Sequence, residues 1–169
     1  MSVLKSLFFP IILTCFAYST SLNAQFYPEY ETAIGVRFGS PFWAASYKTF
    51  LTERNAVEGY IGYRDFNNAS WVSVSAAYQR HHSLHRLTNG LLWYYGGGSS
   101  LYFWNFDSNF NTDAAGTSVG LNAYAGLDYR LTNTRVVFSV DIVPVFFLNG
   151  LSSGFEWDHG GIGIRYVLK

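Results

Sequence analysis

Strict alternation of side-chain character limits the fold of this chain more than any other feature, and it is clearest between Ser118 and Phe147. One face of the first arm is apolar and the other polar, and a second arm, which starts at Val136, repeats the pattern. Side chains on a β-strand point to opposite faces with period 2, so the segment predicts a β-hairpin. A turn at 132–135 pairs Leu131 with Val136, which sets apolar side chains opposite one another along both arms.

The length of the arms and the composition of the chain both favour a membrane. A tilted strand needs roughly 9–11 residues to cross a bilayer, and these arms are longer than most strands of globular sheets. Charged residues make up 13% of the chain and aromatic residues 20%, whereas an average soluble domain has roughly 25% charged residues. The formal net charge is zero and no basic patch stands out, which argues against a nucleic-acid partner.

Residues 1–24 have the pattern of a cleaved signal peptide. Lys5 supplies the positive start, Leu7–Ala17 supplies a short apolar core, and the small-residue site ends at Ala24. An N-terminal membrane anchor and a lipid attached at Cys15 are weaker alternatives, because the core is short and the residues after Cys15 stay apolar. We therefore predict two parts, a signal peptide at 1–24 and a single domain at 25–169.

The predicted domain at 25–169 contains neither a cysteine nor a transmembrane helix. Cys15 is the single cysteine of the chain, so the mature protein is expected to have no disulfide and no thiol chemistry. The longest uncharged run within this domain, 87–106, is interrupted by glycines and serines at 96–100. A membrane polypeptide without helices must be a closed barrel, since closure alone satisfies every backbone polar group in lipid.

Eight alternating segments are expected to form the barrel. They are Glu31–Gly39, Phe42–Leu51, Ala56–Arg64, Trp71–His81, Leu91–Trp104, the two arms of Ser118–Phe147, and Gly160–Lys169. The register of the fifth segment is open, because its glycines are compatible with a β-bulge.

Apart from a tight first connection at Ser40–Pro41, the connections between these segments alternate in length. Short turns are expected at 52–54, 85–90 and 132–135, and longer loops at Asp65–Ser70, Asn105–Thr117 and Leu148–Asp158. Short periplasmic turns and longer extracellular loops are typical of outer-membrane barrels, so the three longer loops are expected at one end. Aromatic residues gather at strand ends, as in interfacial girdles: Phe38, Trp43, Tyr63, Trp71, Trp93, Trp104, Tyr129, Phe146 and Tyr166.

The last strand carries a resemblance to a known family. Gly163–Leu168 resembles the glycine-x-x-aromatic-x-hydrophobic signature with which outer-membrane barrels end, although the chain closes on Lys169 and not on an aromatic residue. With the signal peptide and the eight strands, the chain is similar to the small OmpA/OmpX-type barrels. The fold class is therefore predicted as all-β, an eight-stranded antiparallel up-and-down transmembrane β-barrel.

The family resemblance implies a location, partners and a role. It implies the bacterial outer membrane, reached through the periplasm, with outer-membrane lipid and lipopolysaccharide around the barrel. The barrel-assembly machinery is expected as a partner during biogenesis, and an extracellular partner is expected to bind through the surface loops. The role is then structural, adhesive or protective, with no enzymatic activity and no cofactor.

The interior of an eight-stranded barrel is only wide enough for side chains to fill it. We expect a polar plug and not a conduit, built from a lumen charge network of Arg37, Lys48, Glu58, Arg64, Asp128, Arg130, Asp141 and Arg165. The turn at 52–54 sets Lys48 opposite Glu58 inside the barrel, together with Ala45 opposite Ile61 on the outside. No residue is assigned to catalysis, to a cofactor or to a metal.

Two alternatives belong to other classes of protein. A soluble lipocalin-like ligand-binding barrel also has eight strands, but turns its apolar face inward. An outer-membrane lipid A acyl-hydrolase is suggested by His81 and Ser83, which have the spacing of the histidine-serine pair in that family. Leu84 replaces the family's next asparagine, and the segment lies at the periplasmic end, so interfacial histidines are the preferred interpretation. His159, near Glu156 and Asp158, is weak evidence for a metal site.

Overall fold

The computed structural model describes residues 30–39, 42–66, 69–106, 116–149, 154–157 and 159–169. The predicted signal peptide at 1–24 lies outside these residues. The described residues form ten strand segments: β1 (Thr32–Phe38), β2 (Phe42–Phe50), β3 (Asn55–Phe66), β4 (Ala69–Ser83), β5 (Leu91–Phe106), β6 (Thr117–Arg130), β7 (Val136–Ile142), β8 (Val145–Phe147), β9 (Gly154–Glu156) and β10 (Gly161–Val167). In the described part of the chain, no helix is long and apolar enough to cross a membrane.

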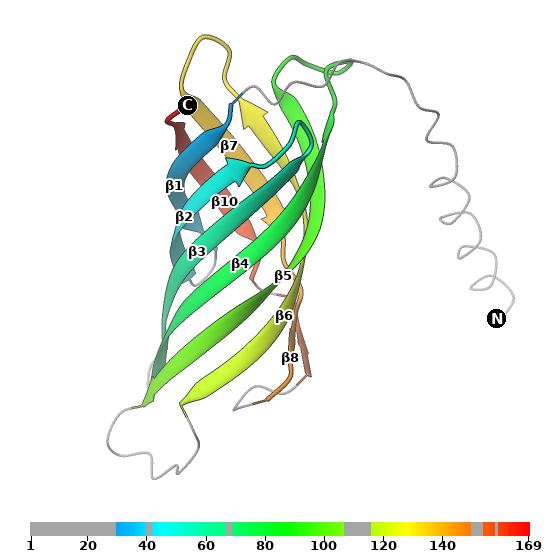
Figure 1. The fold of residues 1–169 in the computed structure, drawn as a ribbon. Helices are drawn as coiled ribbons and strands as arrows, with labels where there is room; N and C mark the ends of the chain where they lie inside the picture. The colour runs from blue at the N-terminus through cyan, green and yellow to red at the C-terminus, as the bar shows by residue number, and fades with distance from the viewer. Residues whose placement is uncertain (1–29, 40–41, 67–68, 107–115, 150–153, 158) are drawn as a thin grey trace, which may run out of the picture.

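These segments form one closed antiparallel barrel of eight strands. Each strand from β1 to β6 pairs with the next along the chain, and β1 also pairs with β10, which closes the ring (Figure 1). β7 and β8 both pair with β6 in one register and form the seventh strand, while β9 and β10 pair with β8 and β7 and form the eighth. The predicted fold class is confirmed.

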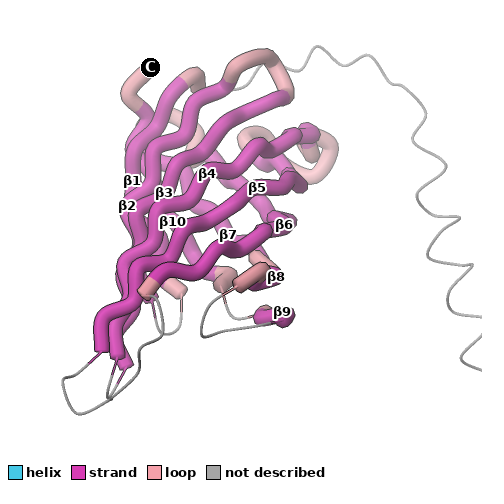
Figure 2. Tube along the Cα trace, turned by 60° about the horizontal axis from the view of Figure 1, so that its bottom comes forward, coloured by secondary structure: helices cyan, strands magenta, loops and turns pink. Residues whose placement is uncertain are grey.

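The seventh strand is interrupted at Val143 and Pro144, which the alternation of the sequence does not predict. Pro144 has no N–H to give to the ladder, although its carbonyl oxygen accepts a hydrogen bond from the N–H of Ala123 at 3.0 Å. The expected loop at Leu148–Asp158 was also wrong in part, because it contains β9. Figure 2 shows β9 beside β8, with which it pairs.

The strand registers fix the tilt of the barrel. A row of paired residues that starts at Tyr129 on β6 passes round all the strands and returns to β6 at Val119, ten residues away. With strands about 4.8 Å apart and a rise of about 3.3 Å per residue, that stagger corresponds to a tilt of about 40°. The steep slope of β3 to β6 across the barrel is visible in Figure 1.

The predicted hairpin registers are correct. Tyr129 lies opposite Phe138 and Leu127 opposite Val140, and on the second hairpin Ala45 lies opposite Ile61. The fifth strand has no bulge, because β4 and β5 pair without interruption from 69 opposite 106 to 83 opposite 92.

The turns after β2, β4 and β6 share one end of the barrel, as predicted. The predicted alternation between short and long connections is wrong. The turns after β2, β4 and β6 lie at one end, with Glu31 and Lys169, and this end is named the turn end (Figure 1). The opposite ends of the strands, from which the other connections leave, are named the loop end. The loop predicted at Asp65–Ser70 was wrong, because strand structure continues to Phe66 and resumes at Ala69, whereas residues 84–90 form a longer turn.

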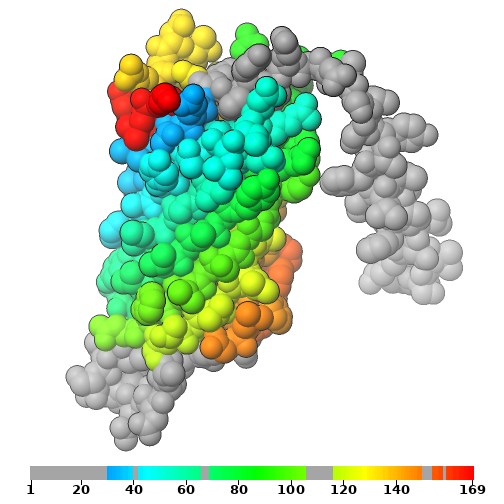
Figure 3. Space-filling model, in the orientation of Figure 1, coloured from blue at the N-terminus to red at the C-terminus, as the bar shows by residue number. Residues whose placement is uncertain are grey.

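The barrel is apolar outside and polar inside. Its exposed large side chains cover the strands from end to end and include Ile34, Val36, Trp43, Tyr47, Ile61, Val72, Val74, Tyr78, Leu101, Leu121, Leu127, Val140, Ile162 and Ile164. Figure 3 shows the strands side by side in a continuous outer wall. A lipocalin-like barrel has the opposite arrangement, so that alternative is wrong for this chain. Trp71 and Trp104, predicted for the girdle, lie on the lumen face of their strands.

The lumen face of β5 needs glycine where the strand passes close to β4. A methyl group at Gly98 would overlap the backbone carbonyl oxygen of Ala76, whereas a methyl group at Gly97, on the outer face, would be 3.7 Å from the nearest backbone atom. We predict that Gly98→Ala lowers the free energy of unfolding by about 1–3 kcal/mol. The matched variant Gly97→Ala should change it by less than about 0.5 kcal/mol.

Urea unfolding in detergent micelles, followed by tryptophan fluorescence, measures both variants. Equal midpoints for Gly97→Ala and Gly98→Ala would contradict the close approach of β4 and β5.

Candidate functional site: the charged lumen

Four charged side chains from four different strands meet in the half of the lumen toward the turn end. They are Lys48 on β2, Glu58 on β3, Asp128 on β6 and Arg165 on β10. Each occupies the inward position of a strand whose neighbouring residues point outward, so alternation alone delivers them to the interior. Their side chains are 0–1% exposed, so bulk water does not solvate these charges.

The four groups alternate in sign around a closed ring, named here the four-charge ring. Lys48 Nζ lies 2.7 Å from Asp128 Oδ2 and 3.7 Å from Glu58 Oε2. Arg165 completes the ring, with Nη2 at 2.6 Å from Glu58 Oε1 and Nη1 at 3.2 Å from Asp128 Oδ1. Two cations and two anions cancel, which removes the cost of an isolated buried ion.

Neighbouring side chains make further contacts with the carboxylates and the lysine of the four-charge ring. Tyr30 donates its hydroxyl to Asp128 Oδ2 at 3.3 Å, and Gln79 Nε2 donates to Glu58 Oε2 at 3.0 Å. His81 Nε2 lies 3.5 Å from Asp128 Oδ2, and Lys48 Nζ lies 4.5 Å from the centre of the Tyr94 ring. These contacts hold the carboxylates in fixed positions.

Arg37 and Asp141 form a second ion pair nearer the loop end. Tyr94 donates its hydroxyl to Asp141 Oδ2 at 2.7 Å, and Arg37 Nη2 donates to the carbonyl oxygen of His159 at 3.3 Å. Because Tyr94 contacts both Lys48 and Asp141, it links this pair to the four-charge ring.

The other two arginines of the predicted lumen network, Arg64 and Arg130, are not members of the four-charge ring or of the Arg37–Asp141 pair. Arg64 is half-buried near the loop end, opposite Phe42 and Trp71, and Arg130 is half-buried at the turn end, opposite Val137. The structure therefore brings together six of the eight residues named from the sequence.

Beyond Arg37, aromatic side chains fill the lumen toward the loop end. Tyr60 and Tyr124 stack with ring centres 6.0 Å apart. The His159 ring lies among four aromatic rings at 5.8–6.2 Å between centres, those of Phe42, Trp71, Tyr102 and Phe147.

A cavity of about 40 Å³ remains between these rings and the polar side chains Ser73, Ser75, Ser100 and Asn122. That volume holds about three or four water molecules, at roughly 10–15 Å³ of cavity for each water.

The described contacts do not bring His81 and Ser83 together as a base and its nucleophile. Ser83 Oγ lies 3.2 Å from His85 Nδ1 in the exposed turn, whereas His81 packs in the lumen against Phe50 and Tyr94. His81 and Ser83 thus belong to different surroundings, contrary to the spacing that suggested a hydrolase. Among the described residues, no group of three His, Cys, Asp or Glu side chains is placed to hold a metal ion.

Sequence reasoning missed Tyr30, His81 and Tyr94 as members of the lumen network. The inward-outward alternation along β4 and β5 could have identified the last two. His81 and Tyr94 lie directly opposite each other on the inner face. Tyr30 precedes β1 and has no alternation pattern to place it.

Comparisons with known proteins concern the fold. A scan against protein-family models and a search of curated proteins found no match. The chain is similar to the N-terminal β-barrel domain of Pseudomonas aeruginosa OprF, with a TM-score of 0.60 and 20% identity, over 81% of this chain and 97% of that chain. It is also similar to Neisserial surface protein A, with a TM-score of 0.62 and 13% identity, over 81% of this chain and 94% of that chain. The fold is that of the small outer-membrane β-barrels.

Arg165 bridges both carboxylates of the four-charge ring, so its loss should be costly. We predict that Arg165→Met lowers the free energy of unfolding by about 3–5 kcal/mol, because two buried carboxylates then share Lys48 as their one cation. The matched variant Arg135→Met removes an exposed arginine from the turn after β6 and should change the stability by less than about 0.5 kcal/mol. Urea midpoints in detergent micelles measure both, and similar midpoints would contradict the role given to Arg165.

Proposed function

We propose that this protein is an integral outer-membrane β-barrel with a plugged polar lumen, which serves the cell envelope through its surface and its loops and not through catalysis. The observation that carries the proposal is the inverted distribution of side chains. Large apolar residues cover the exterior, while six charged side chains are buried inside. Water would penalise that exterior, whereas lipid would not.

The height of the apolar surface supports a bilayer as the surrounding medium. On the outer face of β4, Ser70 and Arg80 are ten residues apart, and the positions between them are Val72, Val74, Ala76 and Tyr78. At a tilt of about 40° and a rise of about 3.3 Å per residue, this stretch is about 25 Å tall. Apolar bands of outer-membrane barrels are about 25 Å tall.

The outer membrane, and export through the periplasm, are proposed from the fold and the sequence together. The two similar solved structures support an outer-membrane barrel, and the predicted signal peptide at 1–24 supports export. The assembly machinery is proposed to recognise the terminal signature Gly163–Leu168, which begins in β10 and ends one residue after it. β10 also closes the barrel against β1.

A structural, adhesive or protective role is proposed because the lumen is filled and the loop end is aromatic. Phe155 and Trp157 are 53% and 68% exposed at the loop end, and their rings contact each other with centres 4.7 Å apart. Exposed aromatic side chains of this kind are suited to contact lipopolysaccharide or an extracellular partner. Phe106 and Phe110, which the sequence also placed in a surface loop, have side chains outside the described residues.

The location and the orientation are tested with a tag inserted at 109, between β5 and β6. We predict that the tagged protein fractionates with outer membranes and that an antibody detects the tag on intact cells. A second tag in the β6–β7 turn, at 133, should be detected only after permeabilisation. The opposite pattern would overturn the orientation, and recovery of the protein in the soluble periplasmic fraction would overturn the membrane proposal.

A further inference from the structure

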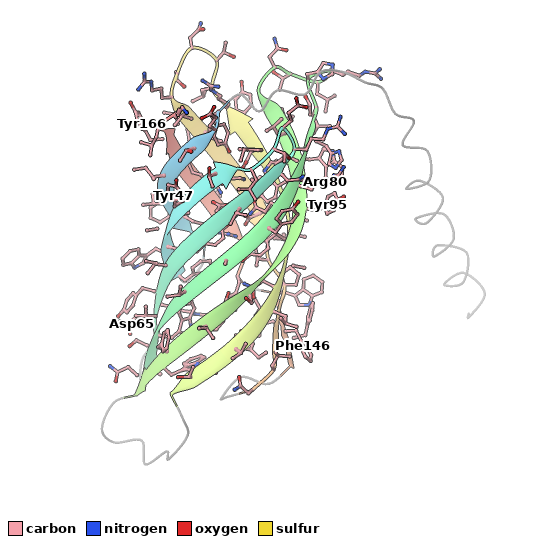
Figure 4. The ribbon with its side chains drawn as sticks, viewed as in Figure 1. Tyr47, Asp65, Arg80, Tyr95, Phe146 and Tyr166 are labelled. Atoms are coloured by element: carbon pink, nitrogen blue, oxygen red, sulfur yellow. The ribbon has the colours of Figure 1, made fainter. Side chains whose placement is uncertain are left out.

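Arg80 is an arginine on the apolar outer face of the barrel. It follows Val74, Ala76 and Tyr78 on the outward side of β4, while Gln79 and His81 on either side of it are buried in the lumen. Figure 4 shows Arg80 and Tyr95 close together on the exterior near the turn end. The described residues provide the Arg80 guanidinium with neither a hydrogen bond nor an ion pair.

The position of Arg80 along the barrel places it at one edge of the apolar band. Arg80 lies opposite Asn55 on β3, and Asp65, ten residues along β3, lies opposite Ser70. These two polar levels are separated by about 25 Å for strands tilted by about 40°. Arg80 therefore lies at the level of the headgroups of one leaflet, where a guanidinium meets lipid phosphates.

Aromatic and polar neighbours form a defined surface around Arg80. Tyr95 lies directly opposite it on β5, and His82 lies opposite Trp93 in the next outward pair toward the turn end. The His82 ring stacks on Trp93 at 4.7 Å and on Tyr95 at 5.7 Å between ring centres. Tyr and Trp side chains prefer this interfacial depth, so the surface is held at the headgroup level.

Charge on the described parts of the two ends points to an anionic ligand. The turn end carries the cations Arg54, Arg80, Arg86, Arg130, Arg135 and Lys169 against the anions Glu31 and Glu53. At the loop end the described charges are Arg64, Asp65 and Glu156. Arg54 and Arg86 lie in the two turns that flank the β3–β4 pair, so they add positive potential on both sides of Arg80.

We propose that Arg80, with His82, Trp93 and Tyr95, forms a binding site for the phosphate headgroup of an anionic glycerophospholipid in the leaflet at the turn end. The guanidinium binds the phosphate oxygens, and the aromatic rings lie beside the glycerol region and upper acyl chains. This inference rests on the proposed function, because it requires the barrel to span a bilayer.

The test uses the purified full-length mature barrel in nanodiscs that contain equal amounts of phosphatidylglycerol and phosphatidylethanolamine. Native mass spectrometry after release from the nanodiscs measures which lipid stays bound. The wild-type barrel should retain phosphatidylglycerol in excess, and Arg80→Gln should reduce that excess by about fivefold. Arg80→Lys should keep most of it, and the matched variant Arg135→Gln, in the turn after β6, should leave it unchanged.

The outcomes separate this site from the function on which it rests. A barrel that does not insert into bilayers overturns the proposed function and the site with it. A barrel that inserts but retains the two lipids equally overturns the site alone. Equal losses in Arg80→Gln and Arg135→Gln would also overturn the site, because they would show a diffuse charge effect and not a localised one.

Discussion

Mutual neutralisation of buried charges in the lumen is the constraint on which the rest of this structure depends. An eight-stranded barrel is too narrow to hydrate isolated ions, yet Lys48, Glu58, Asp128 and Arg165 are buried there. Arg165 belongs to the last strand, and it bridges carboxylates on β3 and β6. The four-charge ring is therefore complete only when β10 closes against β1. Closure of the barrel thus completes the neutralisation of its interior, which favours this stagger of strands over others.

The exterior follows from the same alternation. A strand that sends charges inward at every second residue must send the residues between them outward, so a polar lumen and an apolar surface cannot be separated. Lys48 and Glu58 inside correspond to Tyr47 and Val57 outside. The inverted barrel thus needs lipid on its outer surface, and the few outward polar residues, such as Asp65 and Arg80, mark the edges of the apolar band (Figure 4). Arg80 and Tyr95, at the turn-end edge of this band, are then placed to contact lipid headgroups.

The sequence predicted what depends on local alternation and on short turns, and it missed what depends on closure. The pairing of Lys48 with Glu58 follows from one turn and is found, but the shorter contact of Lys48 is with Asp128, 80 residues away. That contact depends on the stagger of the whole ring, which no single hairpin reveals. The break at Pro144 follows from the missing N–H of proline, which is visible in the sequence. β9 has only three residues, too few to show an alternation pattern. The loop predicted at Asp65–Ser70 was wrong because Asp65 and Ser70 pair across β3 and β4 at the edge of the apolar band, where a polar residue does not indicate a turn.

The direction in which alternate side chains of one strand point is the central claim, and nitroxide scanning along β4 tests it most directly. The mature chain is predicted to lack cysteine, so single cysteines can be introduced at 72–80 and labelled in lipid vesicles. Collision rates with oxygen, which partitions into lipid, should be high at Val72, Val74, Ala76 and Tyr78 and low at the positions between them. Nitroxides at the inward positions should also be shielded from a water-soluble nickel reagent. Equal oxygen collision rates at inward and outward positions, or a reversed pattern, would contradict an inverted barrel in lipid.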